Sequence, residues 1–188
     1  MKSRIKSKKP IKFGKVLVVT KLIANEDSIR SFSANVRRHR PQITEQELNE
    51  EIDAMVRKDN YYNAVMDEVF SAYEFEMDEE EIKERVRVMS ESYPDGNEES
   101  LRNMVLVSIY KKLIYDDLAN DWELKISDED VKRTLESFYK STGQPIREYL
   151  MNRDKFNEVR ATLEEQLISD RLLNAFKVDF QLKAPEEA

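Results

Sequence analysis

The chain has 188 residues, 37% of them charged, and a formal net charge of −7 at pH 7. It contains no cysteine, which excludes disulfides and thiol chemistry, and a single histidine, which excludes histidine-rich metal sites. Only three glycines are present to form turns, so the composition favours helices over sheets, and the length allows one good core or two small ones.

Charge is distributed unevenly along the chain. Residues 1–40 hold 12 Lys and Arg against two acidic residues, whereas residues 41–188 hold 19 against 36. We therefore predict a basic, partly ordered N-terminal arm (1–40) and a helical domain (41–188). The arm could be a solvated leader, could fold back onto the acidic body, or could bind RNA or another polyanion by neutralising phosphates. The candidates for polyanion binding are Lys2, Arg4, Lys6, Lys8, Lys9, Lys12, Lys15, Arg37, Arg38 and Arg40.

Residues 11–23 fit a short strand or a docked helix, and their periodicity does not decide between the two. Their apolar patch, Val16–Val19, is followed closely by Lys21, so it is too short for a signal peptide. No apolar run approaches the roughly 20 residues that a membrane-spanning helix needs. We expect a soluble, cytoplasmic protein with no membrane partner, which agrees with the lack of cysteine.

Three helix starts share one pattern, in which a capping side chain is bracketed by two apolar residues. In residues 43–48 (ITEQEL), Thr44 and Glu47 have the spacing of a capping box. The same layout returns in residues 77–82 (MDEEEI) and 126–131 (ISDEDV). Each first turn also carries two or three carboxylates, which suit the positive end of the helix dipole. We predict helices that begin at these three caps, the first of them a long helix over residues 45–73.

The segments that precede the caps also align with one another. They are residues 64–77 (AVMDEVFSAYEFEM), 113–126 (LIYDDLANDWELKI) and 167–180 (LISDRLLNAFKVDF). In each copy a helix ends and a short extended stretch is predicted to bury alternate residues, with Tyr73, Phe75 and Trp122 as junction core. Turn signals at 93–97 (YPDGN) and 142–145 (TGQP) predict helical hairpins. Together these features predict a mainly all-α fold, an elongated array of helical hairpins and long helices.

Over residues 45–180 this arrangement resembles the C-terminal, substrate-cradling domain of the bacterial chaperone trigger factor, which shares its outline with the helical core of the periplasmic chaperone SurA. The resemblance is carried by the junctions AYEFEMDEEEIKE (72–84) and ANDWELKISDEDVKR (119–133), and residues 152–178 are similar to the domain's closing long helix. It implies a helical cradle for unfolded or nascent chains. The sequence has no room for a prolyl isomerase domain, so we do not expect that activity. It also lacks the family's glycine-rich ribosome-docking loop, and the basic N-terminal arm could substitute for that loop.

No arrangement of residues suited to catalysis is evident. Serines and threonines occur at caps and turns, and His39, the one candidate base, lies in a basic run. The three glycines, at positions 14, 96 and 143, are too far apart to form a phosphate-binding loop. We therefore expect a protein that is not an enzyme and that needs no metal or cofactor.

With catalysis set aside, the remaining class of function is binding. Apolar and flexible side chains on the surface of a highly charged domain suit that role. We predict contacts with unfolded polypeptides at the two hairpin tips, and internal packing of the same residues is the alternative. The candidates are Met89, Tyr93, Leu101 and Met104 at the first tip and Tyr139, Ile146, Tyr149, Leu150 and Met151 at the second.

Two functions follow from these features. The first is an ATP-independent chaperone, a holdase that binds unfolded or nascent polypeptides in a helical cradle. The alternative is a helical adaptor or an RNA- or ribosome-associated protein that acts through the basic arm. A structural dimer that uses the same apolar patches is a third interpretation, so the sequence leaves self-association open.

Overall fold

The computed structural model describes residues 2–94 and 96–182. In these residues the mainly all-α fold is confirmed, and none of the helices combines the length and the apolar character that crossing a membrane requires. The elements in chain order are β1 (Arg4–Lys8), β2 (Val16–Val19), α1 (Glu26–His39), α2 (Glu45–Phe70), β3 (Tyr73–Glu76), α3 (Glu79–Ser92), α4 (Glu98–Asp121), α5 (Asp128–Thr142), α6 (Arg147–Met151), α7 (Arg153–Ala175) and β4 (Lys177–Phe180).

The chain forms two compact units, and each unit is assembled from distant parts of the sequence. The first unit contains the residues up to Lys8 together with Tyr73–Arg171, and the second contains Lys9–Ala72 together with the residues from Leu172 onward. The basic segment 1–40 therefore contributes to both units, because β1 pairs in the first and β2 in the second. The division predicted at residue 40 remains a division of charge, and it does not coincide with the boundary between the units.

In the first unit, two helical hairpins are each held by a small apolar core. The predicted turn at 93–97 lies between α3 and α4, where the Gly96 amide donates to the Tyr93 carbonyl oxygen (3.0 Å); residue 95 lies outside the described residues. The predicted turn at 142–145 lies between α5 and α6, and Gly143 adopts the left-handed φ of +68° that ends α5. The two cores consist of Ile82, Val105 and Ile109, and of Val131, Leu135 and Phe156.

Two of the three predicted capping boxes are confirmed, and the third is built differently. Thr44 with Glu47 caps α2, and Ser127 with Asp130 caps α5, each pair with both reciprocal bonds. At α3, Asp78 accepts from the first-turn amides as predicted, but the Glu81 carboxylate accepts from the Ser3 amide (2.8 Å). The Ser3 hydroxyl oxygen in turn accepts from the Asp78 amide (3.0 Å). The third box was thus predicted wrongly, because β1 brings Ser3, from 75 residues away, to complete the cap.

Replacing Ser3 with alanine is expected to lower the free energy of unfolding of the first unit by about 1 kcal/mol, the usual cost of losing a helix cap. The Ser3 side chain is buried, so water cannot replace the lost acceptor for the Asp78 amide. Thermal unfolding followed by circular dichroism measures the change. Ser7→Ala is the matched control, because the Ser7 hydroxyl donates to Glu74 on the exposed surface. An unchanged melting temperature for Ser3→Ala would remove this role.

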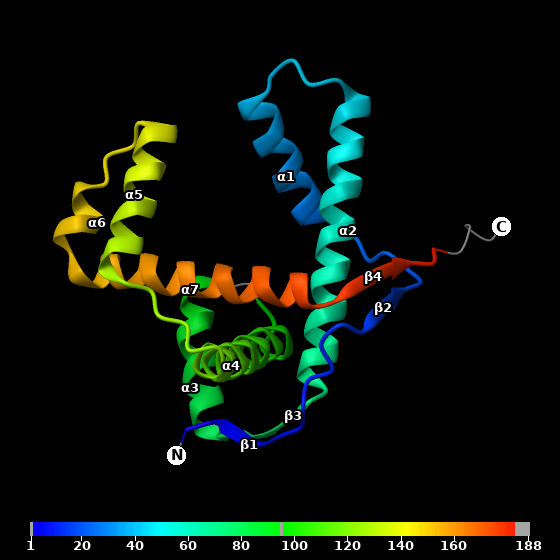
Figure 1. Cartoon of the computed structure of the whole chain (residues 1–188), viewed down its shortest axis with the longest axis vertical. Helices are drawn as coiled ribbons and strands as arrows, with labels where there is room; N and C mark the ends of the chain where they lie inside the picture. Colours follow the sequence, from blue (N-terminus) through cyan, green and yellow to red (C-terminus); the bar gives the residue numbers. More distant parts are fainter. Residues whose placement is uncertain (1, 95, 183–188) are drawn as a thin grey trace. The chain divides into compact units, whose positions relative to one another are not determined.

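In the second unit, α2 carries a parallel pair of strands on one flank and α1 on another (Figure 1). Residues 11–23, for which the sequence allowed a strand or a helix, contain the strand Val16–Val19. This strand pairs with β4 and places Leu17 opposite Val178. Leu17 and Val19 are buried beneath the pair, where they extend the apolar core. The long helix predicted over 45–73 is α2, which ends at Phe70, because β3 begins at Tyr73.

The three aligned junctions share buried positions but differ in their strand partners. The helix residues at equivalent positions, Val69, Leu118 and Leu172, are all fully buried. The extended stretches after the first and third junctions form β3 and β4, which pair with β1 and β2. Among the described residues no strand pairs with residues 122–126, and Trp122 stays half-buried, with the Arg171 guanidinium 4.4 Å from the centre of its ring. The N-terminal segment supplies two strands, one for each of two junctions.

Candidate functional site

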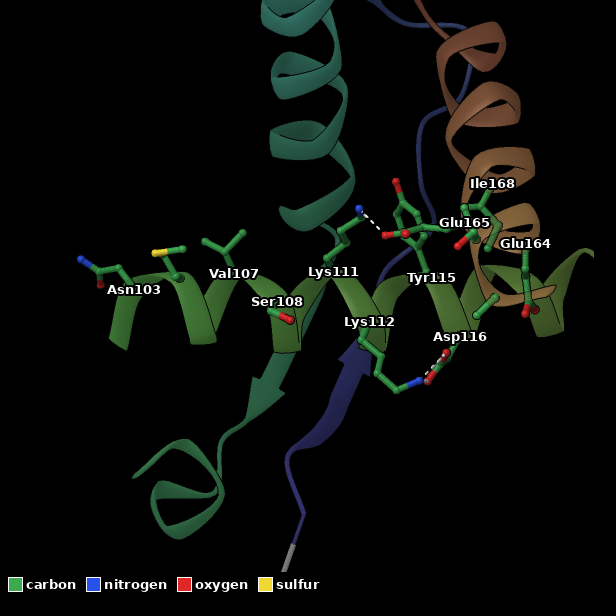
Figure 2. Close-up of a pocket in the computed structure, with 13 residues that line it drawn as sticks. Asn103, Val107, Ser108, Lys111, Lys112, Tyr115, Asp116, Glu164, Glu165 and Ile168 are labelled. Atoms are coloured by element: carbon green, nitrogen blue, oxygen red, sulfur yellow. Dashed lines mark hydrogen bonds and ion pairs between the residues drawn. The ribbon is translucent and has the colours of Figure 1, made fainter. Parts of the chain in front are cut away.

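A groove of the first unit lies between α4 and α7 and has a volume of about 830 Å³ (Figure 2). Helix α4 can form one wall because its apolar residues occupy two faces. Leu101, Val105 and Ile109 follow a spacing of four and are buried, whereas Met104, Val107, Lys111 and Tyr115 form a separate row that faces the groove. The lining residues are Asn103, Met104, Val107, Ser108, Lys111, Lys112, Tyr115, Asp116, Ala161, Thr162, Glu164, Glu165 and Ile168.

The closed end of the groove is held by polar contacts between the two helices. Lys111 of α4 forms an ion pair with Glu165 of α7, and its ammonium lies 5.3 Å from the centre of the Tyr115 ring (Figure 2). The Tyr115 hydroxyl is hydrogen-bonded to the Ser169 hydroxyl (2.8 Å), and Ile168 is fully buried beside it. These contacts fix the separation of α4 and α7 at this end.

The open end of the groove is apolar and accessible. Met104 is 47% exposed and Val107 is 65% exposed, although both line the groove. A methionine thioether adapts its shape to different neighbours, and a valine adds apolar area without a polar atom. A groove with a fixed base and an adaptable apolar rim can accept side chains of various shapes.

A smaller pocket of about 380 Å³ lies between α3 and α4. Val88, Met89 and Tyr93 supply its apolar lining, and Val88 and Tyr93 are half-exposed. Ser108 lines both this pocket and the larger groove, so α4 lines a cavity on each of two sides. Glu84 and Arg85 place charges at the rim of the pocket.

A third apolar surface is formed by the hairpin of α5 with α6. Tyr139, Tyr149, Leu150 and Met151 are exposed, as predicted for this tip. Ile146 is different, because it is partly buried against the core of Val131, Leu135 and Phe156. Neither of the two pockets described above includes these side chains.

The structure thus separates the nine predicted polypeptide-binding residues. Met89, Tyr93 and Met104 line the two pockets, whereas Leu101 is 4% exposed and belongs to the core, so its prediction as surface is corrected. The sequence could not separate Leu101 from Met104, because both belong to one broad apolar stripe, and only the packing of α4 divides that stripe into a buried face and a groove-facing one. The prediction missed other exposed apolar residues, among them Val88, Val107 and Phe138 of the two hairpins. For Val107 a signal existed, since it follows Met104 at a spacing of three. Binding of a polypeptide by any of these residues stays a prediction.

Half of the ten predicted polyanion-binding cations pair with carboxylates of the chain itself. Arg4 pairs with Glu76 (2.7 Å), Lys15 with Glu68 (2.6 Å), Arg37 with Glu45 (2.7 Å) and Arg40 with Glu51, and Lys8 pairs with both Asp117 (2.5 Å) and Asp121. This matches the interpretation in which the arm folds back onto the acidic body. In the part of the chain that the structure describes, Lys2, Lys6, Lys9, Lys12 and Arg38 make no ion pair, and polyanion binding by them stays a prediction.

Lys8 is the centre of a polar cluster that ties β1 and β3 to α4. Burial opposes its charge, but the hydrogen bonds to Asp117 and Asp121 outweigh that effect and raise its pKa. The Tyr73 hydroxyl donates to Asp117 (2.8 Å), and burial together with this bond raises the pKa of Tyr73. Lys8 therefore stays charged and Tyr73 neutral around pH 7, so the cluster holds the N-terminal strand in place.

Comparison with known proteins agrees with the resemblance noted in the sequence. Residues 34–109 match the family described as bacterial trigger factor protein (TF) C-terminus. The chain is 31% identical to the uncharacterized protein MG377 of Mycoplasma genitalium over 183 residues, which are 97% of this chain and 95% of that protein. It is 30% identical to the MG377 homolog of Mycoplasma pneumoniae, with the same shares covered.

The fold also matches a solved structure. The crystal structure of a hypothetical Mycoplasma protein, MPN555, superposes with a TM-score of 0.77 at 28% identity, covering 96% of this chain and 92% of that one. Likeness over nearly the whole length places the strands and helices of both units in a shared fold. The chain belongs to the family of the Mycoplasma protein MG377, and it carries a segment of the trigger factor C-terminal type at residues 34–109.

Proposed function

We propose that the chain is an ATP-independent holdase of the cytoplasm, which binds unfolded or nascent polypeptides through the groove between α4 and α7. The proposal assigns it no reaction and no cofactor. The observation that carries it is the open end of this groove, where Met104 and Val107 keep about half or more of their surface exposed. Exposed apolar side chains inside a groove of about 830 Å³ offer apolar area that the side chains of a bound polypeptide can cover.

The surroundings of the groove suit clients of many sequences. Its apolar rim can accept one or two apolar side chains, while Asn103, Ser108 and Thr162 offer hydrogen bonds to a client backbone. The charged residues along both walls keep the open surface soluble. Affinity from so few apolar contacts is modest, which is what a holdase that must release its clients requires.

The family likeness supports the same function. The matched segment, residues 34–109, includes α3 and the first half of α4, the elements that carry the smaller pocket and the rim of the groove. The C-terminal domain of trigger factor, which the sequence resembles, holds substrate polypeptides. The alternative that places the function in the basic arm receives less support, because five of its ten cations are paired within the chain.

The test is suppression of aggregation when a chemically denatured enzyme is diluted into buffer without ATP. The wild-type chain is expected to lower light scattering at equimolar amounts. Changing both Met104 and Val107 to serine is expected to weaken client binding at least about tenfold, because each removes apolar area worth roughly 1.5 kcal/mol or more when buried. Fluorescence anisotropy with a labelled unfolded client measures the affinity directly.

The matched control is Ile23→Ser, which removes an apolar side chain that is 74% exposed and lies in the second unit, outside the groove. It is expected to protect the client as the wild type does. Equal protection by the wild type and by the Met104/Val107 double variant, with both folded by circular dichroism, would contradict the groove as the binding site. Failure of the wild type to protect any client would contradict the holdase function itself.

A further inference from the structure

The parallel pair β2–β4 of the second unit has an open edge along β2. The Lys177 amide donates to the Lys15 carbonyl oxygen (3.2 Å), and the Gln181 amide donates to that of Val19 (3.0 Å). In a parallel pair, the residues of one strand alternate between facing the partner and facing away. With Leu17 opposite Val178, it follows that Lys15, Leu17 and Val19 direct their backbone groups toward β4.

Val16 and Val18 therefore direct their amides and carbonyl oxygens away from β4. Among residues 2–94 and 96–182, no strand pairs with this side of β2 and no hydrogen bond to these backbone groups is present. Their side chains are also accessible, with exposed fractions of 50% and 52%. Open edges of this kind are usually shortened, charged or covered, because they pair readily with another extended chain.

We propose that the β2 edge binds an extended segment of an unfolded polypeptide as a third strand, with apolar or β-branched side chains of that segment against Val16 and Val18. The chemistry of the site specifies this ligand: two amides and two carbonyl oxygens in a row are satisfied by the backbone of a strand. Backbone recognition is independent of sequence, and the two valines add a preference for apolar residues at alternate positions.

The length of the edge favours a transient peptide over a second copy of the chain. Four residues of strand cover far less than the roughly 1,200 Å² that stable protein–protein interfaces bury. A short edge gives a weak complex that forms and dissociates quickly, which suits a segment of an unfolded client. The choice of an unfolded chain as ligand rests on the proposed holdase function, whereas the edge itself is independent of the groove in the first unit.

The test uses a peptide of six alternating valine and threonine residues flanked by lysines, together with the same peptide N-methylated at alternate amides on one edge. Binding of the unmodified peptide to the full chain is expected to shift the amide resonances of Val16 and Val18 and to protect them from hydrogen exchange. N-methylation is expected to weaken binding about tenfold or more, since it removes backbone hydrogen bonds. Equal binding of the two peptides would overturn the proposal.

Val18→Pro is the matching change in the protein, because the amide it removes faces the open edge and proline is tolerated on edge strands. Val18→Pro is expected to weaken peptide binding by about the same factor as N-methylation of the peptide. Val18→Thr keeps the amide, so its affinity for the peptide is expected to be closer to that of the wild type than that of Val18→Pro is. If Val18→Pro does not fold, the methylated peptide still decides the question. If the wild-type chain and Val18→Pro differ in sedimentation coefficient in the absence of peptide, a second copy of the chain occupies the edge. That result would also overturn the proposal.

The Met104/Val107 double-serine variant separates this proposal from the holdase function. In this variant the peptide is expected to shift the amide resonances of Val16 and Val18 at the same peptide concentrations as in the wild type, because the β2 edge and the groove belong to different units. Loss of client protection with retained peptide binding contradicts nothing in the edge proposal. Disappearance of the Val16 and Val18 shifts in the double variant would show that they depend on the groove, and it would overturn the edge proposal.

Discussion

Replacing Ile82 with alanine is expected to lower the free energy of unfolding of the first unit by roughly 2–5 kcal/mol, the range for deleting a large buried aliphatic side chain. Ile82 is fully buried and packs with Val105 and Ile109 where α3 meets α4, and Met77 and Val86 close over the same cluster. The change leaves a cavity in this cluster, and the stiff helices on either side can fill it only in part. Urea unfolding followed by circular dichroism measures the loss.

Val88→Ala is the control for that experiment, because Val88 lies on the same helix but is half-exposed at the pocket between α3 and α4. We expect a change within about 0.5 kcal/mol, as is usual for surface substitutions. The pair also separates stability from function, since Val88→Ala alters the lining of a predicted binding pocket while the core stays intact. A loss from Ile82→Ala no larger than that from Val88→Ala would show that α3 is not held by this cluster.

Asn60→Ala is expected to lower the free energy of unfolding of the second unit by about 2–3 kcal/mol, because the buried Asn60 side chain makes three hydrogen bonds to the backbone. Its side-chain oxygen accepts from the Ile23 amide (2.8 Å), and its nitrogen donates to the carbonyl oxygens of Ile23 and Val56 (both 2.8 Å). Alanine leaves the backbone of Ile23 without these partners. The segment after β2 is then no longer fastened to α2.

The matched control is Asn63→Ala, on the same helix but exposed, which is expected to change stability by less than about 0.5 kcal/mol. Hydrogen exchange gives the more specific measurement, because the Ile23 amide should lose its protection in Asn60→Ala and keep it in Asn63→Ala. Retained protection at Ile23 in Asn60→Ala would show that the segment is held by other contacts.

The helical part of the fold could be predicted from the sequence because its signals are local. A cap acts on amides two or three residues away, and an apolar stripe repeats every three or four residues, so α2, α5 and both hairpins could be located before any tertiary contact was known. α1 was missed although it carries such signals: Asn25 accepts from the Ser28 amide, two acidic residues open the first turn, and a basic run closes the last. The residues of this basic run were predicted to bind a polyanion instead of to end a helix.

The candidate site was predicted only in part, because exposure depends on the packing partner of each helix face. Met104 and Leu101 lie three residues apart on α4, yet one lines an open groove and the other is buried. Which face packs against α3 and which lies opposite α7 is decided by contacts between residues distant in the sequence. Periodicity marks a face as apolar but does not say what covers it.

The sequence alone determined α2, α5 and both hairpins with their turns, the capping boxes of α2 and α5, the charge of the arm and the likeness to the trigger factor C-terminus, since each of these depends on neighbouring residues or on their order. Tertiary structure determined which residues the basic arm contacts. Lys8 meets Asp117 across 109 residues of chain, and Ser3 completes the cap of α3 across 75. It also decided which strands pair, and so left one edge of β2 open. Contacts over such separations depend on the path of the whole chain, and no local pattern encodes them.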